Sequence, residues 1–300
     1  MPENKENRQS ITFGVLKGAC ASKPPLDFSF TSSIVANSMK KYPTYSDSTP
    51  SATENNLRLN KALAHSGIAS RRAADTMIQE GRVAVNGEVV NEPGTRVNVA
   101  TDTVYVDGKA LLFDQSARKT YLLCNKPVQV VATVKDPQGR KTVMDLLPDT
   151  FRKERLYPVG RLDYFSEGLL LLTNDGEMTL RLTHPRYHLP KVYHVTVREK
   201  PSGAVLEIMR RGMTLAEGEK LAPIQVTLLP DKNFLLEMTL NQGVNRQIRR
   251  MCRDLDLTIL RLVRLSAGPL HLGDLPLGAI RALTPQELTA VKKAVGMPSL

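Results

Sequence analysis

The sequence has few cysteines and no long apolar run, and each scarcity excludes a class of protein. No apolar run is longer than Leu169 to Leu172, whereas a helix needs roughly 20 apolar residues to cross a bilayer. We therefore expect no membrane span. Cys20, Cys124 and Cys252 lie far apart, without the paired spacing of a zinc site or a disulfide framework. This pattern favours a reducing compartment, and we expect the cytoplasm.

Histidine is also scarce and does not form a metal-binding pattern. His184, His188 and His194 lie near one another, but Pro185 and Pro190 interrupt the stretch. No helix can therefore present two imidazoles on one face. The sequence predicts no metal site.

Positive charge is what the sequence has in excess. Its 300 residues include 41 Lys and Arg against 30 Asp and Glu, which gives a formal net charge of +11. Such a balance suits a polyanionic partner, because neutralising phosphates releases counterions, although a merely basic surface explains the charge equally well. The length is sufficient for about two domains with a buried core.

Composition and hydrophobic patterning divide the chain into four segments. Residues 1–56 are polar and aperiodic, so we expect a disordered extension; a targeting segment and a mis-assigned start remain alternatives. A small domain is expected over 57–103. A linker is expected over 104–119, where the charged stretch from Asp114 to Lys119 lies, and a larger domain over 120–300.

The small domain has the pattern of two helices followed by hairpins. Gly67 can end the first helix, and Ser70 can cap the second. Asn86-Gly87 predicts a two-residue hairpin turn, and Asp107-Gly108 repeats the signal. The second helix begins with Arg71 and Arg72, where free N–H groups already favour a phosphate.

These residues carry a resemblance. The run from Arg58 to Asp75 (RLNKALAHSGIASRRAAD), followed by Gly81-Arg82-Val83 and Val85-Asn86-Gly87, resembles the RNA-binding domain shared with ribosomal protein S-four. The alternative is an ordinary solvated helix-turn-helix. The RNA-facing residues expected from the resemblance and the charge pattern are Arg58, Lys61, Ser70, Arg71, Arg72 and Asn86.

The larger domain contains many short alternating strands and few helices. Strands are expected at 121–124, 192–197 and 234–240, without the regular strand and helix alternation of a parallel sheet. We therefore predict an α+β fold on a mixed, largely antiparallel sheet. Thr284, Pro285 and Glu287 give a capping box that starts a final helix ending near Val295.

The densest pattern of the chain runs from Gly160 to Gly176. Leu169 to Leu172 predict a strand that is covered on both faces, and Gly168 lets the chain enter it closely. Asp163 lies in the preceding loop, which suits a fixed but reachable carboxylate. By itself, a loop Asp is more often a turn former or an ion-pair partner.

The segment resembles the signature of pseudouridine synthases of the branch that modifies small- and large-subunit ribosomal RNA. Supporting motifs occur in the right order: LLCNKP at 122–127, DPQGRKTV at 136–143 and KVYHVTV at 191–197. The resemblance implies that Asp163 is the nucleophile or base that breaks the bond from ribose to uracil nitrogen 1, before the base rejoins through carbon 5. It also implies that no cofactor or metal takes part.

The resemblance also implies the surroundings of Asp163. An amphipathic helix with an apolar stripe at Ile248 and Met251 presents several arginines. The family's later motif makes Arg249 the partner that keeps Asp163 charged, and leaves Arg246 and Arg250 as phosphate or structural contacts. Solvated arginines are the alternative.

Four further residues complete the expected site. Tyr193 is a buried core tyrosine on strand pattern alone, but its family counterpart stacks on the target uracil. Leu260, with Leu262 as its rival, is expected beside the base. Arg161 is expected to contact substrate, and Lys126 to contact RNA.

The sequence departs from the family at Gln129, where Gly is common, and at Ser166, where Thr is common. Gln129 places the backbone shape of that loop in doubt, because Gln adopts positive φ less readily than Gly. Two other functions remain open: a non-catalytic factor for ribosome assembly, and a glycosidase, which would need a second carboxylate such as Glu167 or Asp175. We expect a monomer that acts on a structured stem-loop of ribosomal RNA. Residues 246–251 resemble those of the family members that modify large-subunit RNA, so we expect the large subunit.

Overall fold

The computed structural model describes residues 56–113, 119–187, 189–230 and 234–298. The expected N-terminal extension, apart from residue 56, and residues 114–118 of the expected linker lie outside these residues. No helix in the described residues is long and apolar enough to cross a membrane.

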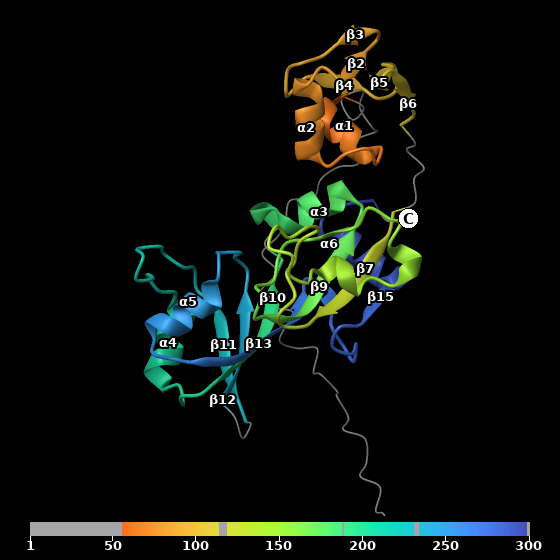
Figure 1. Ribbon diagram of the computed structural model, residues 1–300. Helices are drawn as coiled ribbons and strands as arrows, with labels where there is room; N and C mark the ends of the chain where they lie inside the picture. The colour runs from red at the N-terminus through yellow and green to blue at the C-terminus, as the bar shows by residue number, and fades with distance from the viewer. Residues whose placement is uncertain (1–55, 114–118, 188, 231–233, 299–300) are drawn as a thin grey trace, which may run out of the picture. The chain divides into compact units, whose positions relative to one another are not determined.

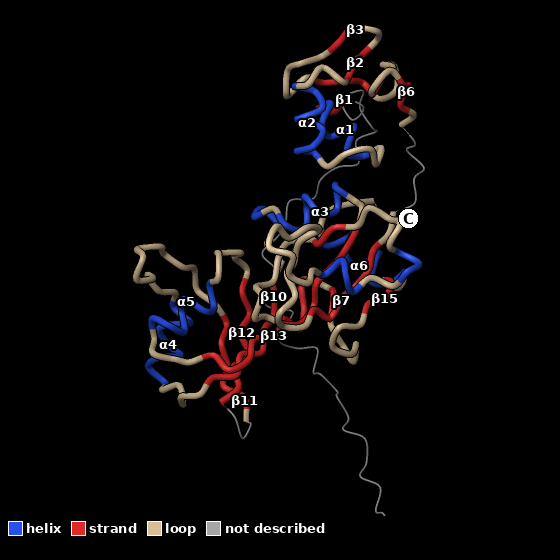
Figure 2. Tube along the Cα trace, in the orientation of Figure 1, coloured by secondary structure: helices blue, strands red, loops and turns tan. Residues whose placement is uncertain are grey.

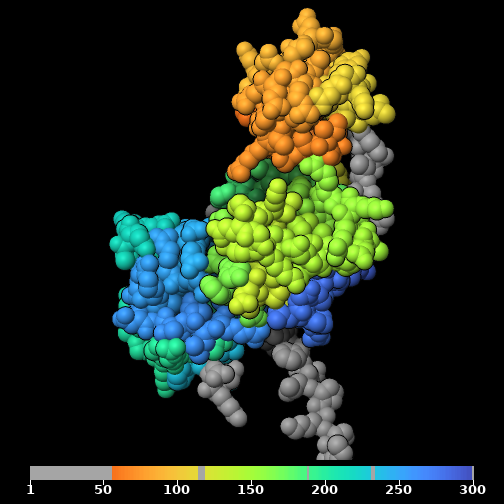
Figure 3. Space-filling view, viewed as in Figure 1, coloured from red at the N-terminus to blue at the C-terminus, as the bar shows by residue number. Residues whose placement is uncertain are grey.

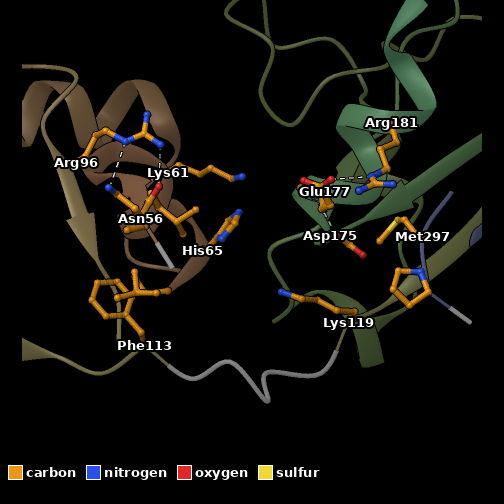
Figure 4. Close-up of a pocket in the computed structure, with 16 residues that line it drawn as sticks. Asn56, Lys61, His65, Arg96, Phe113, Lys119, Asp175, Glu177, Arg181 and Met297 are labelled. Atoms are coloured by element: carbon orange, nitrogen blue, oxygen red, sulfur yellow. Dashed lines mark hydrogen bonds and ion pairs between the residues drawn. The ribbon is translucent and has the colours of Figure 1, made fainter. Parts of the chain in front are cut away.

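Residues 56–113 begin with two helices, α1 (Leu59–His65) and α2 (Arg71–Gln79). The strands that surround and follow them are β1 (Asn56–Arg58), β2 (Val83–Val85), β3 (Glu88–Val89), β4 (Arg96–Asn98), β5 (Val104–Val106) and β6 (Lys109–Leu111). β1 pairs with β4, and a second antiparallel sheet has the order β3-β2-β5-β6 (Figures 1 and 2). Arg96 strengthens the first pair by donating to the side chain and backbone of Asn56 (Figure 4).

The local signals of this part are confirmed. The Ser70 hydroxyl accepts a hydrogen bond from the Ala73 N–H, and Gly67 has a φ of 85° just after the first helix. Asn86 and Gly87 have φ values of 53° and 91°, as the predicted hairpin turn requires.

The expected linker boundary at residue 104 is wrong. Residues 104–111 form the β5–β6 hairpin, which pairs with β2 and so continues the small sheet. Val104 and Val106 are buried in the same hydrophobic cluster as α1 and α2. The Asp107-Gly108 turn signal was correct, and Arg82 fixes that turn with two hydrogen bonds to the Asp107 carboxylate, at 2.7 and 2.8 Å.

Residues 119–298 are built on one mixed sheet. Its described strands follow the order β11-β12-β10-β13-β9-β7-β15, and in addition β8 pairs with β9 and β14 pairs with β13 (Figures 1 and 2). The strands are β7 (Tyr121–Lys126), β8 (Tyr157–Pro158), β9 (Glu167–Thr173), β10 (Lys191–Val197), β11 (Gln225–Leu229), β12 (Phe234–Leu240), β13 (Ile259–Ala267), β14 (Leu270–His271) and β15 (Ile280–Ala282). The predicted α+β class, with a largely antiparallel sheet, is confirmed.

The α-helices of this part are α3 (Gly176–Thr183), α4 (Gly203–Arg211), α5 (Gln247–Asp254) and α6 (Pro285–Ala294). Short 3₁₀ helices lie at Val143–Leu146, Asp149–Phe151 and Pro185–Tyr187. The capping box predicted for α6 is present, and the helix ends before Val295 as expected. Asp175 caps α3, whose first turn holds Glu177 in an ion pair with Arg181 (Figure 4).

Strand β9 is an inner strand of the sheet, between β13 and β7. All its residues are buried. Leu170 and Leu172 belong to one hydrophobic cluster and Leu169 and Leu171 to another, so both faces are covered, as predicted. On one side β9 pairs with β7 in antiparallel fashion, and on the other it pairs with β13 in parallel. The segment before β9 is therefore attached to a strand that cannot shift easily.

Candidate active site

Asp163 lies in the loop between β8 and β9, and its side chain is about one-third exposed (30%). The loop is attached at both ends. Val159 N–H donates to the carbonyl of Leu171, and Leu162 is buried in the core. Ser166 N–H donates to the carbonyl of Asp163 itself, which closes a tight turn. Asp163 is thus fixed in position and still reachable from solvent.

Close packing behind the loop depends on Gly168. Its φ is 105°, and a Cβ placed there would lie 2.3 Å from the Arg264 carbonyl oxygen. The Arg264 side chain, itself buried, donates to the carbonyl of Leu169 at 2.7 Å. The backbones of β9 and β13 are therefore too close here for any side chain at position 168, as the glycine led us to expect.

Arg249, on α5, lies beside Asp163 and lines the same cleft. Its Nε lies 3.5 Å from Asp163 Oδ2. Its Nη2 donates to the Phe165 carbonyl at 2.8 Å and to the Ser166 hydroxyl at 3.0 Å. Burial lowers the pKa of Arg249, while Asp163 acts in the opposite direction. The same guanidinium thus faces the carboxylate and holds the loop that carries it.

A second guanidinium also reaches Asp163. Arg246 Nη1 lies 3.6 Å from Asp163 Oδ2, and its side chain is 52% exposed against 18% for Arg249. Arg246 precedes α5 with a φ of 50°, in the left-handed region that non-glycine residues rarely adopt. This contact could not be predicted from the sequence, because the positive φ of an arginine leaves no local signal.

One cleft brings together Asp163 and several other predicted residues. Its lining includes Arg161, Asp163, Tyr193, Arg246, Arg249 and Leu262. Tyr193 is partly buried on β10 and packs against the neighbouring cores. The cleft therefore offers an aromatic ring, an apolar side chain and a carboxylate between two cations.

Leu260 was the wrong choice between the two leucines of β13. It is 57% exposed and is absent from the lining of the cleft, whereas Leu262 is buried and lines it. The register explains this difference. Thr196 pairs with Arg261 but Val197 pairs with Ile259, so Leu260 is the extra residue of a β-bulge and points away.

Lys126 does not lie on an RNA-facing surface, contrary to expectation. It is the last residue of β7 and is completely buried, with Nζ donating to the Pro127 carbonyl at 2.8 Å. Burial lowers its pKa to about 8, an effect that Asp163 and Glu167 partly oppose. Its charge therefore acts on Asp163 and Glu167 from within the protein.

Arg250 is held by carboxylates instead of being free for phosphate. Its guanidinium lies 3.1 Å from Glu217 and 2.7 Å from Glu219. In the space-filling view the segment that contains these acids (teal) borders the blue segment that contains α5 (Figure 3). Two roles were left open for Arg250, a phosphate contact and a structural contact. These ion pairs support the structural role.

The expected RNA-facing residues of the small part differ in availability. Arg58, Arg71 and Arg72 are exposed, and Lys61 is partly buried. Ser70 is occupied as the helix cap. The Asn86 amide donates to Asp102 and accepts from the Thr103 N–H, so its side chain stabilises the hairpin.

Gln129 takes the positive φ that a glycine would supply. Its φ is 60°, and its N–H donates to the Tyr164 carbonyl at 2.7 Å. The loop after β7 therefore keeps contact with the loop that carries Asp163, despite the departure at this position.

Neither alternative carboxylate is free. Glu167 forms a bidentate pair with Arg261, its closest contact at 2.7 Å, and Asp175 caps α3 while accepting from the Tyr121 hydroxyl at 2.7 Å. Among the described residues no group of His, Cys, Asp and Glu side chains could hold a metal ion.

Comparison with known proteins identifies the two parts. Residues 120–254 match the family model of RNA pseudouridylate synthases, and residues 57–104 match the S4 domain. An RNA pseudouridine synthase of Aquifex aeolicus, described as uncharacterized, is 44% identical over 243 residues, which are 80% of this chain and 96% of that protein. The ribosomal large subunit pseudouridine synthase B of Bacillus subtilis is 40% identical over 239 residues, 78% of this chain and 95% of the relative.

A solved structure agrees with these matches. A crystal structure of a pseudouridylate synthase superposes with a TM-score of 0.57 at 27% identity, covering 78% of this chain and 99% of that one. The chain therefore belongs to the RNA pseudouridine synthase family, in the branch whose members carry an N-terminal S4 domain.

Proposed function

We propose that this enzyme isomerises a specific uridine of large-subunit ribosomal RNA to pseudouridine, with Asp163 as the catalytic carboxylate. The observation that carries the proposal is the pairing of Asp163 with Arg249 in a cleft that Tyr193 also lines. A carboxylate that acts as nucleophile or base must be ionised, and an adjacent guanidinium favours the ionised form.

The reaction is an exchange of two bonds. Asp163 attacks the ribose or removes a proton from it, and the bond from C1′ to uracil N1 breaks. The freed uracil turns within the cleft, and C5 bonds to C1′ while the bond from Asp163 to C1′ breaks or, where Asp163 took a proton, while that proton returns to the ribose. Carbon 5 then loses its proton and N1 gains one, so that the product is an isomer of the substrate.

The other residues of the cleft suit a flipped base. Tyr193 offers a ring face on which uracil can stack, and Leu262 offers an apolar wall. Arg161 and Arg246 are exposed cations at the same cleft, placed to meet the phosphates that flank the target. Leu262 takes the role that the sequence analysis assigned to Leu260.

We further propose that residues 57–113 form the RNA-binding domain, the exposed Arg71 and Arg72 of α2 binding phosphate. The large-subunit substrate is supported by the Bacillus subtilis relative, whose name states that activity. The alternative of a glycosidase loses support because Glu167 and Asp175 have other partners.

The test is chemical mapping of pseudouridine in ribosomal RNA from cells that carry wild-type protein, the Asp163→Asn variant, or neither. We expect one or a few large-subunit sites that depend on the wild type and are lost with Asp163→Asn. Asp149→Asn is the matched control, because the Asp149 carboxylate is 93% exposed and lies outside the cleft. Unchanged modification in the absence of the protein would refute the assignment, and a non-catalytic assembly factor would then be favoured.

A further inference from the structure

Phe165, two residues after Asp163, keeps an unusual degree of exposure for a large aromatic side chain. It is 60% exposed, and its ring lies edge-on to that of Tyr164, with centroids 5.0 Å apart. A single exposed apolar residue is ordinary on a protein surface. The residues around Phe165 suggest that its exposed ring binds a ligand.

The backbone of Phe165 is fixed by a hydrogen bond, whereas its ring is exposed to solvent. Its carbonyl accepts from Arg249 at 2.8 Å. The residues on either side are fixed as well: the Tyr164 carbonyl accepts from Gln129 N–H at 2.7 Å, and Ser166 N–H donates to the Asp163 carbonyl at 3.0 Å. The ring is therefore presented to solvent from a rigid loop, the preorganisation that favours binding.

The ring lies outside the cleft that receives the reacting base. Asp163 and Ser166 line that cleft, whereas Phe165 does not. A nucleobase on Phe165 would thus be a neighbour of the target uridine and not the target itself. Extruding a base from its stack leaves that neighbour without a stacking partner.

The charges beside Phe165 indicate a nucleic acid and not an apolar protein partner. Arg161 and Arg246 are exposed and line the adjacent cleft. The Arg140 guanidinium lies over the neighbouring Tyr164 ring, 5.8 Å from its centroid, and is itself paired with Asp136 at 2.8 Å, so the phosphate contacts are left to Arg161 and Arg246. Aromatic rings interleaved with cations are the pattern that binds single-stranded RNA, with bases on the rings and phosphates at the cations.

We propose that Phe165 is a stacking platform for a nucleobase adjacent to the target uridine. This inference rests on the proposed function. In the bound complex, Phe165 replaces part of the stacking that the neighbouring base loses when uridine enters the cleft. The residue binds substrate and takes no part in bond exchange.

The experiment measures RNA affinity and steady-state kinetics with a transcript of the ribosomal RNA region that wild-type protein modifies. Phe165→Ala should weaken binding and raise KM about tenfold, with little change in kcat, since base stacking on an aromatic residue accounts for roughly 5- to 100-fold in affinity. Phe165→Trp should retain binding, and Phe165→Leu should not. Leu260→Ala is the matched control, because Leu260 is equally exposed (57%) and lies outside the cleft.

A second arm removes the base instead of the ring. Transcripts with an abasic site on either side of the target should bind wild type less tightly at one position, and there Phe165→Ala should cause no further loss. Equal losses on intact and abasic RNA, or full binding by Phe165→Leu, would overturn the stacking role. Wild-type protein that binds the transcript and modifies no uridine would instead overturn the proposed function itself.

Discussion

Arg249 contacts Asp163 and the loop that carries it with one guanidinium. Nε lies 3.5 Å from the carboxylate, while Nη2 donates to the Phe165 carbonyl and the Ser166 hydroxyl. Only a planar group with several donors can do both, because a lysine ammonium is a point charge. Charge compensation and loop geometry are therefore coupled at this residue.

Arg249→Lys should lower kcat by about 100-fold or more, the size typical for losing one preorganised electrostatic contact, while RNA affinity stays near that of wild type. The matched change Arg246→Lys should have a smaller effect on kcat, because Arg246 contacts Asp163 from a largely exposed position, at 3.6 Å. Single-turnover kinetics with saturating enzyme measure both. Equal losses in the two variants would contradict the positioning role of Arg249.

Gly168→Ala should destabilise the protein by roughly 3 kcal/mol or more, because its new methyl group would overlap the Arg264 backbone at a φ of 105°. Gly203→Ala is the control. Nothing lies within 4 Å of a Cβ there, and the residue begins α4, so stability should stay equal or rise by about 0.5 kcal/mol. Chemical denaturation measures both variants, and a well-tolerated Gly168→Ala would refute the close approach of β9 and β13.

Lys126→Met should change how stability depends on pH. The pKa of Lys126 is lowered from 10.5 to about 8 by burial, so between these values the unfolded chain binds more protons than the folded one. Stability contributed by this group therefore rises with pH across that window, by about 3 kcal/mol at most. Wild type should gain stability relative to Lys126→Met between pH 8 and 10.5. Parallel curves for the two proteins would show that the buried lysine does not titrate in this range.

Gln129→Gly should stabilise the protein by about 0.5 kcal/mol, because Gln129 holds a φ of 60° that glycine adopts without strain. Gln138→Gly is the opposite case. Gln138 is not among the positive-φ residues, so glycine there only adds freedom to the unfolded chain and should destabilise slightly. Thermal denaturation of both variants measures the difference, and equal effects would argue against strain at Gln129.

Replacing Arg71 and Arg72 together by Ala should weaken RNA binding uniformly across sequences. It should also reduce the dependence of log affinity on log salt by about 1.5, since each phosphate contact contributes roughly 0.7 to 0.9. Arg250→Ala should leave that slope unchanged, because Arg250 is paired with Glu217 and Glu219. Binding titrations over a range of salt concentrations measure this slope. A changed slope in Arg250→Ala would show that Arg250 contacts RNA after all.

The elements that the sequence predicted well are those specified locally. The Thr284 capping box, the Asn86-Gly87 turn and the buried leucines of β9 each depend on neighbours in the chain, so their patterns identified them. The position of Asp163 before β9 followed from the same pattern. The assignment of Arg249 came from the family resemblance, and no local pattern distinguishes it from the neighbouring arginines.

The residues that sequence reasoning misplaced depend on distant partners. Arg250 is kept from phosphate by Glu217 and Glu219, more than 30 residues away in the chain, whereas Arg249 contacts the Asp163 loop. Leu260 and Leu262 would share a strand face, but the bulge opposite Thr196 separates them. Lys126 ends β7 in full burial, which its motif could not show.

The parallel contact of β9 with β13 also determines when the enzyme can become complete during translation. Arg264 contacts the Leu169 carbonyl across 95 residues of chain, and Arg249 joins the loop from nearly as far. The small RNA-binding part, by contrast, contains all its paired strands between residues 56 and 111. A growing chain can therefore complete the strand pairs of its S4 part long before Arg249 and Arg264 are available to complete the cleft around Asp163.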